Sequence, residues 1–289
     1  MNTLHNVDDR LRPLWDFDDL DATERRFREQ LELEQSDAGR AEVMTQLARV
    51  SGLRGDFDEG ERLLDEATTH GRESAFAQAY IDLERGRLRR SSGDPAAALP
   101  LFESAFAEAL QADQHFVAAD AAHMAALAAA DRDGFVAWTQ RGIDLAEERE
   151  GASYWLGPLL NNLGWEYYEA ADYALALDAF ERALRARERD PANASAIEVA
   201  RYAVGKTLRA LGRAQEAIPL LEQAVAWTDR EGSPDGWFHE ELAEDYAAVG
   251  RPAHAREHAR RAISLLEADD PSFAEDEARK THLRSLGQI

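Results

Sequence analysis

Glycine recurs in this sequence at a fixed interval, and this interval constrains the fold more than any other feature. Gly55 and Gly93 lie 38 residues apart, and so do Gly212 and Gly250. After each glycine, alanines and larger apolar residues recur at intervals of three, four and seven, which places them on one face of a helix. Glycine accepts the positive φ that ends a helix at little cost. The sequence therefore predicts a series of helical hairpins, most of them with a glycine in the turn.

One segment, residues 157–191, shows the pattern most fully: GPLLNNLGWEYYEAADYALALDAFERALRARERDP. Gly164 and Ala176 are small where two antiparallel helices must approach closely. Tyr167 and Phe180 are large and fill the space between the helices. The order of a leucine-glycine pair, an aromatic residue, and then Ala-x3-Phe resembles the tetratricopeptide repeat.

The repeats of this chain are longer than the tetratricopeptide consensus of about 34 residues. Their period is 38 to 41 residues, because extra residues fall between repeats, as at 149–153 and 230–235. In this respect the chain is similar to the long-repeat variety of kinesin light chain and of many bacterial regulators and peptide receptors. The resemblance implies an all-α fold, a right-handed superhelix (α-solenoid) of about six helix pairs.

Both ends of the predicted array carry additional helices. We expect an N-terminal arm and capping helix over residues 1–38, the repeat array over 39–270, and a C-terminal capping helix over 271–289. Asp21 is the expected N-cap of the first helix. The last helix is expected over 272–286. Trp15 and Phe17 lie in the arm, and the sequence leaves open whether they dock on the first repeats or occupy the groove.

The resemblance also implies which side chains line a concave groove, because the first helix of each tetratricopeptide repeat faces it. Aromatic and arginine side chains, which often dominate binding energy, are common at these positions. The sequence does not fix the register of the third repeat, which contains His123. The predicted groove residues are Arg49, Arg87, Arg90, His123, Asn161, Trp165, Tyr168, Tyr202, Lys206 and Arg209.

The charges at these positions predict the chemistry of a partner. The cations favour a protein or peptide with acidic groups, whereas Glu240 and Glu244 at the far end favour a cation. A simpler interpretation is that these side chains form solvated helix faces and packing between repeats. The family's clamp for a C-terminal carboxylate is predicted to be absent, because Val199 and Ala203 stand where its cations would be.

Composition narrows the partners and the chemistry further. The net charge is −23, so we expect no binding to nucleic acid or to an anionic membrane. The chain has no cysteine, which excludes disulfides and thiolate metal sites. Without a signal peptide or a long apolar segment, we expect a cytoplasmic protein, either a monomer or a weak homodimer.

One motif suggests catalysis, and we discount it. Residues 254–258 read H-x-x-E-H, in which two histidines share a helix face and could bind zinc. However, Ala255, Ala259 and Ala262 mark this helix as the packing helix of the sixth repeat. We therefore predict no metal, no cofactor and no enzyme activity.

The sequence predicts a non-catalytic scaffold or adaptor that recognises an extended segment in the groove. The alternative is a sensor of a small signalling peptide or metabolite that relays a conformational change to a partner. An enzyme that uses groove histidine and carboxylates is the third possibility.

Overall fold

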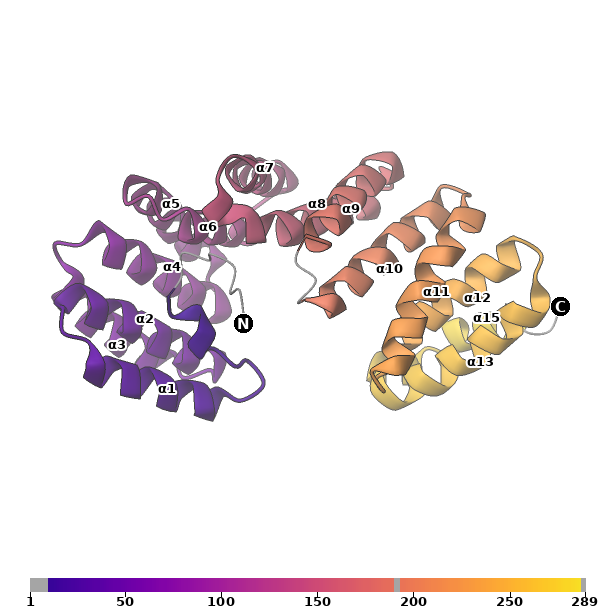
Figure 1. Cartoon of the computed structure of the whole chain (residues 1–289), viewed down its shortest axis with the longest axis horizontal. Helices are drawn as coiled ribbons and strands as arrows, with labels where there is room; N and C mark the ends of the chain where they lie inside the picture. Colours follow the sequence, from indigo (N-terminus) through magenta and orange to yellow (C-terminus); the bar gives the residue numbers. More distant parts are fainter. Residues whose placement is uncertain (1–9, 190–192, 287–289) are drawn as a thin grey trace. The chain divides into compact units, whose positions relative to one another are not determined.

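The computed structural model describes residues 10–189 and 193–286. These residues form fifteen α-helices and two short 3-10 helices, with no strand among them (Figure 1). The all-α class predicted from the repeats is confirmed. None of the described helices is long and apolar enough to span a membrane.

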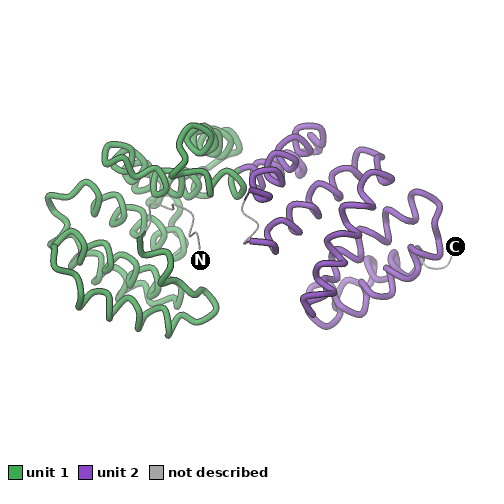
Figure 2. The backbone as a smooth tube through the Cα atoms, in the orientation of Figure 1, with its two compact units in different colours: residues 1–159 green, residues 160–289 purple. Residues whose placement is uncertain are grey.

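The chain divides into two compact units, residues 1–159 and 160–289, and passes from one to the other within α8, Leu156–Glu169 (Figure 2). The other elements of unit 1 are η1 Arg12–Leu14, α1 Leu20–Leu33, α2 Asp37–Leu53, α3 Phe57–Gly71, α4 Ala75–Ser91, α5 Pro95–Gln111, α6 His115–Ala128, α7 Arg132–Glu148 and η2 Glu150–Trp155. The other elements of unit 2 are α9 Tyr173–Arg187, α10 Ala194–Ala210, α11 Ala214–Arg230, α12 Gly236–Ala248, α13 Pro252–Asp269, α14 Pro271–Glu275 and α15 Glu277–Leu286.

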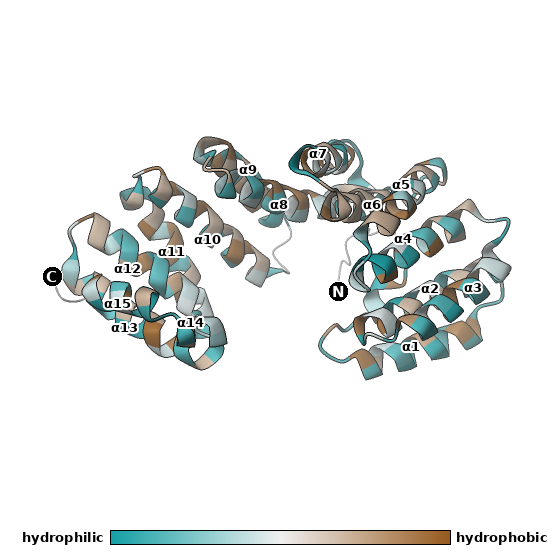
Figure 3. Ribbon diagram, turned by 180° about the vertical axis from the view of Figure 1, so that it is seen from behind, coloured by the Kyte–Doolittle hydropathy of each residue, from teal (hydrophilic) through white to brown (hydrophobic). Residues whose placement is uncertain are grey.

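Consecutive helices pack as pairs within each unit. In unit 1 the pairs are α2 with α3, α4 with α5 and α6 with α7. Among the first helices, α2 packs on α4 and α4 packs on α6. In unit 2, α10 pairs with α11 and α12 with α13, and α10 packs on α12. Hydrophobic and hydrophilic segments alternate along these helices, as amphipathic packing requires (Figure 3). We call the surface shared by α2, α4 and α6 the first-helix face of unit 1.

The turns within the pairs follow the glycine pattern. Gly55, Gly93, Gly212 and Gly250 have φ between 72° and 96°, which confirms the predicted turns. At each one the next residue donates its backbone N–H to a carbonyl five residues earlier, a bond that closes a helix C-terminus. Ala171 takes the same role with φ 60°, although alanine disfavours this conformation.

Small residues on the first helix of a pair make room for a phenylalanine on the second. A Cβ atom at Gly86 would lie 2.5 Å from the ring of Phe102, and one at Gly164 would lie 2.5 Å from the ring of Phe180. Both rings are fully buried. The contact between Gly164 and Phe180 allows α8 and α9 to pack closely, as the sequence predicted for the fourth repeat.

The capping helices differ in detail from the prediction. The N-cap of α1 is Asp19, whose side chain accepts from Ala22 N at 2.8 Å, rather than Asp21. The C-terminal segment forms two short helices instead of one. They separate at Asp276, because its side chain accepts from Arg279 N at 2.9 Å and so begins a new helix.

Candidate functional site

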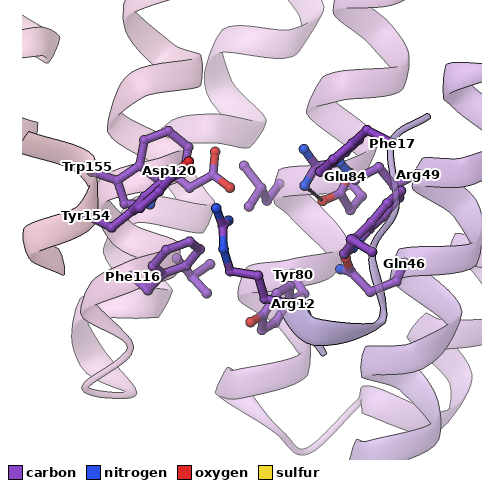
Figure 4. Close-up of a pocket in the computed structure, with 13 residues that line it drawn as sticks. Arg12, Phe17, Gln46, Arg49, Tyr80, Glu84, Phe116, Asp120, Tyr154 and Trp155 are labelled. Carbon is purple, nitrogen blue, oxygen red and sulfur yellow. Dashed lines mark hydrogen bonds and ion pairs between the residues drawn. The ribbon is translucent and has the colours of Figure 1, made fainter. Parts of the chain in front are cut away.

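The first-helix face of unit 1 carries a pocket with a cavity of about 150 Å³. Three first helices and η2 line it together with the N-terminal arm, which we define as residues 10–17 (Figure 4). The lining is mostly aromatic, with arginine and carboxylate side chains between the rings. The lining residues are Arg12, Trp15, Phe17, Gln46, Arg49, Tyr80, Leu83, Glu84, Phe116, Val117, Asp120, Tyr154 and Trp155.

The arm is fixed to the capping helix on one side. The backbone N–H of Asp16 donates to Thr23 Oγ1 at 2.9 Å, and that hydroxyl donates back to Asp16 O at 2.8 Å. Thr23 and Phe27 are fully buried, and Phe27 packs edge-on against Trp15 with ring centroids 5.2 Å apart. These contacts hold the arm beside the repeats.

On its other side the arm docks on α2. Trp15 Nε1 donates to Gln46 Oε1 at 2.9 Å, and Trp15 stacks on Phe17 with centroids 4.8 Å apart. The guanidinium of Arg49 lies over both rings, at 5.2 Å and 5.6 Å from their centroids. Arg10 Nε donates to Glu42 Oε2 at 2.8 Å. The arm therefore docks on the first repeat and also forms one wall of the pocket.

The opposite wall consists of α6 and η2. Phe116 packs against Tyr154 and Trp155, with centroids 5.8 Å and 5.6 Å apart, and His123 packs against Trp155 at 5.3 Å. Arg12 reaches across from the arm and lies 4.2 Å from the Tyr154 centroid. In Figure 4 its guanidinium points into the pocket, toward Asp120.

Carboxylates at the floor of the pocket bind the predicted groove cations. Arg87 donates to Glu84 and, at 2.5 Å, to Asp120. Arg49 Nη1 lies 3.8 Å from Glu84 Oε1. Burial alone would lower the pKa of Arg87, but Asp120 and Glu84 raise it above its usual value. Arg87 is thus a positive charge balanced within the protein.

Unit 2 has a similar arrangement of aromatic residues and paired charges. Trp165 and Tyr168 of α8 pack edge-on at 5.5 Å. Lys206 and Arg209 of α10 both donate to Glu241 of α12, with Arg209 Nε at 2.9 Å from Glu241 Oε2.

These contacts shift the pKa values of the groups involved. Burial opposes the ionisation of Glu241, but the two cations lower its pKa overall. Burial raises the pKa of Tyr202, which stacks on Phe238, to about 12.

The C-terminal helix α15 contacts α12 in unit 2. Arg279 Nε of α15 donates to Glu240 Oε1 at 2.7 Å, and its guanidinium lies 4.1 Å from the centroid of the exposed Trp237. His282 Nε2 lies 2.5 Å from Glu244 Oε1. The two carboxylates predicted to favour a cation from a partner are therefore matched with groups of the chain itself.

The histidines of the H-x-x-E-H segment lie in packing contacts. His258 Nδ1 is 2.8 Å from Nδ1 of the buried His239, and His254 stacks on Tyr246 with centroids 4.8 Å apart. Burial lowers the pKa of His239 to about 4. Within residues 10–189 and 193–286, no three His, Asp or Glu side chains are arranged to hold a metal.

The predicted site residues fall into two groups, one on each unit. Arg49 and Arg87 share Glu84 as a partner in unit 1, where Arg90 Nε donates to Leu127 O at 3.3 Å. Burial lowers the pKa of His123. In unit 2, Trp165 and Tyr168 form an aromatic pair, Lys206 and Arg209 share Glu241, and Asn161 is half-buried on α8.

The sequence-based site list lacked most of the pocket lining. Phe116 and Asp120 were omitted because the register of the third repeat was open. Tyr154 and Trp155 follow the extra residues at 149–153, and an aromatic pair directly after that extension was an available signal. Nothing in the sequence indicated Arg12 as a site residue, because the groove positions were assigned within the repeats and Arg12 precedes them.

Comparisons with known proteins agree with this architecture. Models of the tetratricopeptide repeat match residues 159–189 and 199–229. No curated protein matches the sequence.

Three similar solved structures are each less than 20% identical in sequence to this chain, so they show the fold alone. BtubC (BKLC) from P. vanneervenii has a TM-score of 0.59 and 19% identity, over 71% of this chain and 89% of that one. A STAND protein from Pyrococcus horikoshii with a tetratricopeptide repeat sensor has a TM-score of 0.68 and 12% identity; 91% of this chain matches 42% of that one. The apo quorum sensor NprR from B. thuringiensis has a TM-score of 0.54 and 12% identity, over 93% and 83% of the two chains.

Proposed function

Because the chain is a tetratricopeptide-repeat protein, we propose that it is a non-catalytic scaffold that binds an extended segment of a partner protein. The tetratricopeptide fold supports a role in protein interaction in general, because stacked repeats present extended binding surfaces. The specific proposal is that the binding surfaces are the first-helix face of unit 1 and, in unit 2, the surface shared by α10 and α12. Cytoplasmic location and a monomeric or weakly dimeric state stay predictions.

The observation that carries the proposal is the pocket of unit 1. Six aromatic rings and two arginines from five separate elements converge on a single cavity. Aromatic and arginine side chains are enriched where interfaces concentrate their binding energy, and anchors usually insert into preformed pockets. Packing of the repeats alone does not require so many rings around a cavity.

The sequence predicted a preference for acidic groups from all the groove cations, but some of these cations already bind carboxylates of the chain. Arg87, Lys206 and Arg209 bind Glu84, Asp120 and Glu241. Each of these cations therefore already has a carboxylate partner within the protein. A preference for acidic groups must come from cations that the protein leaves without a carboxylate.

A second candidate function is a sensor of a small signalling peptide or metabolite. The size of the cavity, about 150 Å³, suits one side chain or a small group better than a folded surface. Two of the proteins with similar structures have sensor roles: the STAND protein carries a tetratricopeptide repeat sensor, and NprR is a quorum sensor. A sensor would bind a small molecule from a protein-free extract, whereas a scaffold would not.

The proposal can be tested by affinity capture followed by direct binding. Proteins captured by the wild-type chain are identified, and the dissociation constant of each purified candidate is measured for variant baits. Tyr154→Ala removes an aromatic wall of the pocket. Leu110→Ala removes an exposed apolar side chain of α5, a second helix, and is the matched control.

For a true partner we expect Tyr154→Ala to weaken binding about tenfold or more, the effect typical of an aromatic anchor. Leu110→Ala should bind like the wild type. Circular dichroism confirms that both variants are folded. Equal binding by the two variants would show that the partner uses another surface.

A further inference from the structure

Arg12 differs from the other arginines around the pocket of unit 1. Arg87 binds Glu84 and Asp120, Arg49 lies near Glu84, and Arg10 binds Glu34 and Glu42. Within the described residues, the guanidinium of Arg12 has no carboxylate partner and lies over two aromatic rings, those of Tyr154 at 4.2 Å and Phe116 at 5.5 Å.

Stacking of this kind leaves the edge of a guanidinium available. The planar group has five N–H donors in a fixed fork, which matches the two oxygens of a carboxylate. When a ring covers one face of the group, the donors still point outward in the plane. Figure 4 shows the guanidinium end of Arg12 directed toward Asp120, among the residues that line the cavity.

The charge balance of the pocket favours an anion. Two carboxylates, Glu84 and Asp120, line the cavity, and both bind Arg87, which does not line it. With Arg12 and Arg49 included, three guanidiniums stand against two carboxylates. One added carboxylate would bring this set to neutrality, whereas an added cation would leave two excess positive charges in a half-enclosed space.

Burial of Glu84 strengthens this balance. Its side chain is 1% exposed, and burial raises the pKa of its carboxyl group. Its Oε2 atom has no hydrogen-bond partner. Any protonation of this group lowers the negative charge that an incoming anion would face.

We propose that Arg12 and the aromatic walls form a binding site for a carboxylate side chain of the partner segment, with the N-terminal arm as part of the receptor. The site rests on the proposed function and gives it a specific chemistry. The arm delivers the guanidinium to Tyr154 and Phe116, while Trp15 and Phe17 close the other side. A glutamate or aspartate of the partner would bind Arg12 in the cavity, with Arg49 as the second cation.

This site lies outside the repeat positions from which the groove was predicted. Arg12 belongs to η1, ahead of the first repeat, and Tyr154 belongs to η2, in the extension between two repeats. Two segments outside the repeat positions therefore supply Arg12 and Tyr154 to the site, whereas the repeat cation Arg87 forms internal ion pairs.

The test uses two matched probes and fluorine NMR. The full chain is produced with 5-fluorotryptophan, so that Trp15 and Trp155 report from opposite walls of the cavity. Their signals are assigned by Trp→Phe substitution. N-acetyl-glutamate amide and N-acetyl-glutamine amide are titrated to tens of millimolar at constant ionic strength. The probes differ only in the charged oxygen, and N-acetyl-lysine amide tests the opposite charge.

We expect the glutamate probe to shift both signals in a saturable manner and the other two probes to bind at least tenfold more weakly. Arg12→Gln should weaken the binding of the glutamate probe about tenfold or more. Arg141→Gln is the control, because Arg141 also stacks on an aromatic ring, that of Trp138 at 4.4 Å, but does not line this pocket. It should bind like the wild type.

Three results would overturn the proposal: no saturable shift with the glutamate probe, equal or stronger binding of the glutamine or lysine probe, or unchanged binding in folded Arg12→Gln. None of them bears on the capture experiment with Tyr154→Ala. That variant tests the binding surface through an aromatic contact. The proposed scaffold function can therefore be correct even if the proposed carboxylate site is wrong.

Discussion

At the scale of single residues, the seven turns with positive φ among the described residues show where the chain tolerates strain. Ala171 and Asp113 hold φ near 60°, a region that costs a side-chain-bearing residue about 1–2 kcal/mol. The glycines at the equivalent turns avoid this cost. The strain at Ala171 therefore comes from the alanine side chain, since the same turn conformation is unstrained when glycine occupies it.

We expect Ala171→Gly to stabilise the protein by about 0.5–1 kcal/mol, because relief of the strained φ exceeds the extra entropy of an unfolded glycine. Gly212→Ala is the matched reverse change, at a turn with φ 73° and open space around the missing Cβ. It should destabilise by about 1 kcal/mol. Urea denaturation measures both, and a loss of stability in Ala171→Gly would contradict the argument.

Asp245 is a buried carboxyl group without a hydrogen-bond partner. Both of its oxygens are unpaired, and burial, followed by the charge of nearby Glu241, raises its pKa to about 8. The unfolded chain would ionise this group near pH 4. Between about pH 4 and pH 8 the folded state therefore holds a proton that the unfolded state has lost, and the stability that this group contributes falls as pH rises.

Asp245→Asn should remove this dependence and stabilise the protein at pH 7.5 by about 1–3 kcal/mol, with a smaller gain at pH 5. Denaturation in urea at both pH values gives the comparison. Burial lowers the pKa of His239 to about 4, which destabilises the protein below pH 6.5 and acts in the opposite direction. An equal effect of Asp245→Asn at both pH values would refute the assignment.

At the scale of helices and their pairs, most of the fold could be predicted. The glycines, the alanines and Phe180 follow a pattern that depends only on local spacing, and the structure places them as expected. The pocket could not be predicted in the same way. Helical periodicity puts Arg87 or Lys206 on a face, but it does not show that Asp120 or Glu241 of the next first helix lies opposite.

The arm shows the same limit. Its contacts join Arg12 to Tyr154 and Trp15 to Gln46, residues far apart in the chain that no repeat pattern connects. Sequence reasoning found the aromatic residues of the arm but left open where they pack. Contacts between the arm and the repeats depend on which residues lie close together in the folded protein. The spacing of residues within one repeat does not indicate this.

The contact between α4 and α5 provides a test at this scale. Gly86→Ala would place a Cβ atom 2.5 Å from the ring of the fully buried Phe102, so the two helices would have to separate. We expect a loss of about 1–3 kcal/mol, typical of overpacking.

The double variant Gly86→Ala with Phe102→Leu should lose less stability than the sum of the two single changes, since the smaller side chain accepts the methyl group. Thermal and urea denaturation of the four proteins in this cycle give the coupling. Additive losses would show that the glycine has another role.

At the scale of the whole molecule, the dominant quantity is charge. The chain carries −23, and this self-repulsion opposes folding at low ionic strength. Many surface ion pairs act in the other direction, but each exposed pair contributes little. The melting temperature should rise by a few degrees between 20 mM and 500 mM sodium chloride, which corresponds to the order of 1 kcal/mol. A falling melting temperature would mean that ion pairs dominate.

The central claim is that the first-helix face of unit 1 binds a protein segment, and site-specific photo-crosslinking tests it most directly. The photoreactive residue p-benzoylphenylalanine replaces Tyr154 in the pocket or Leu110 on α5, and adducts formed in lysate of the native cells are identified by mass spectrometry. We predict a defined protein adduct at position 154 that is absent at position 110. Adducts at 110 alone, or none at either position, would contradict the claim.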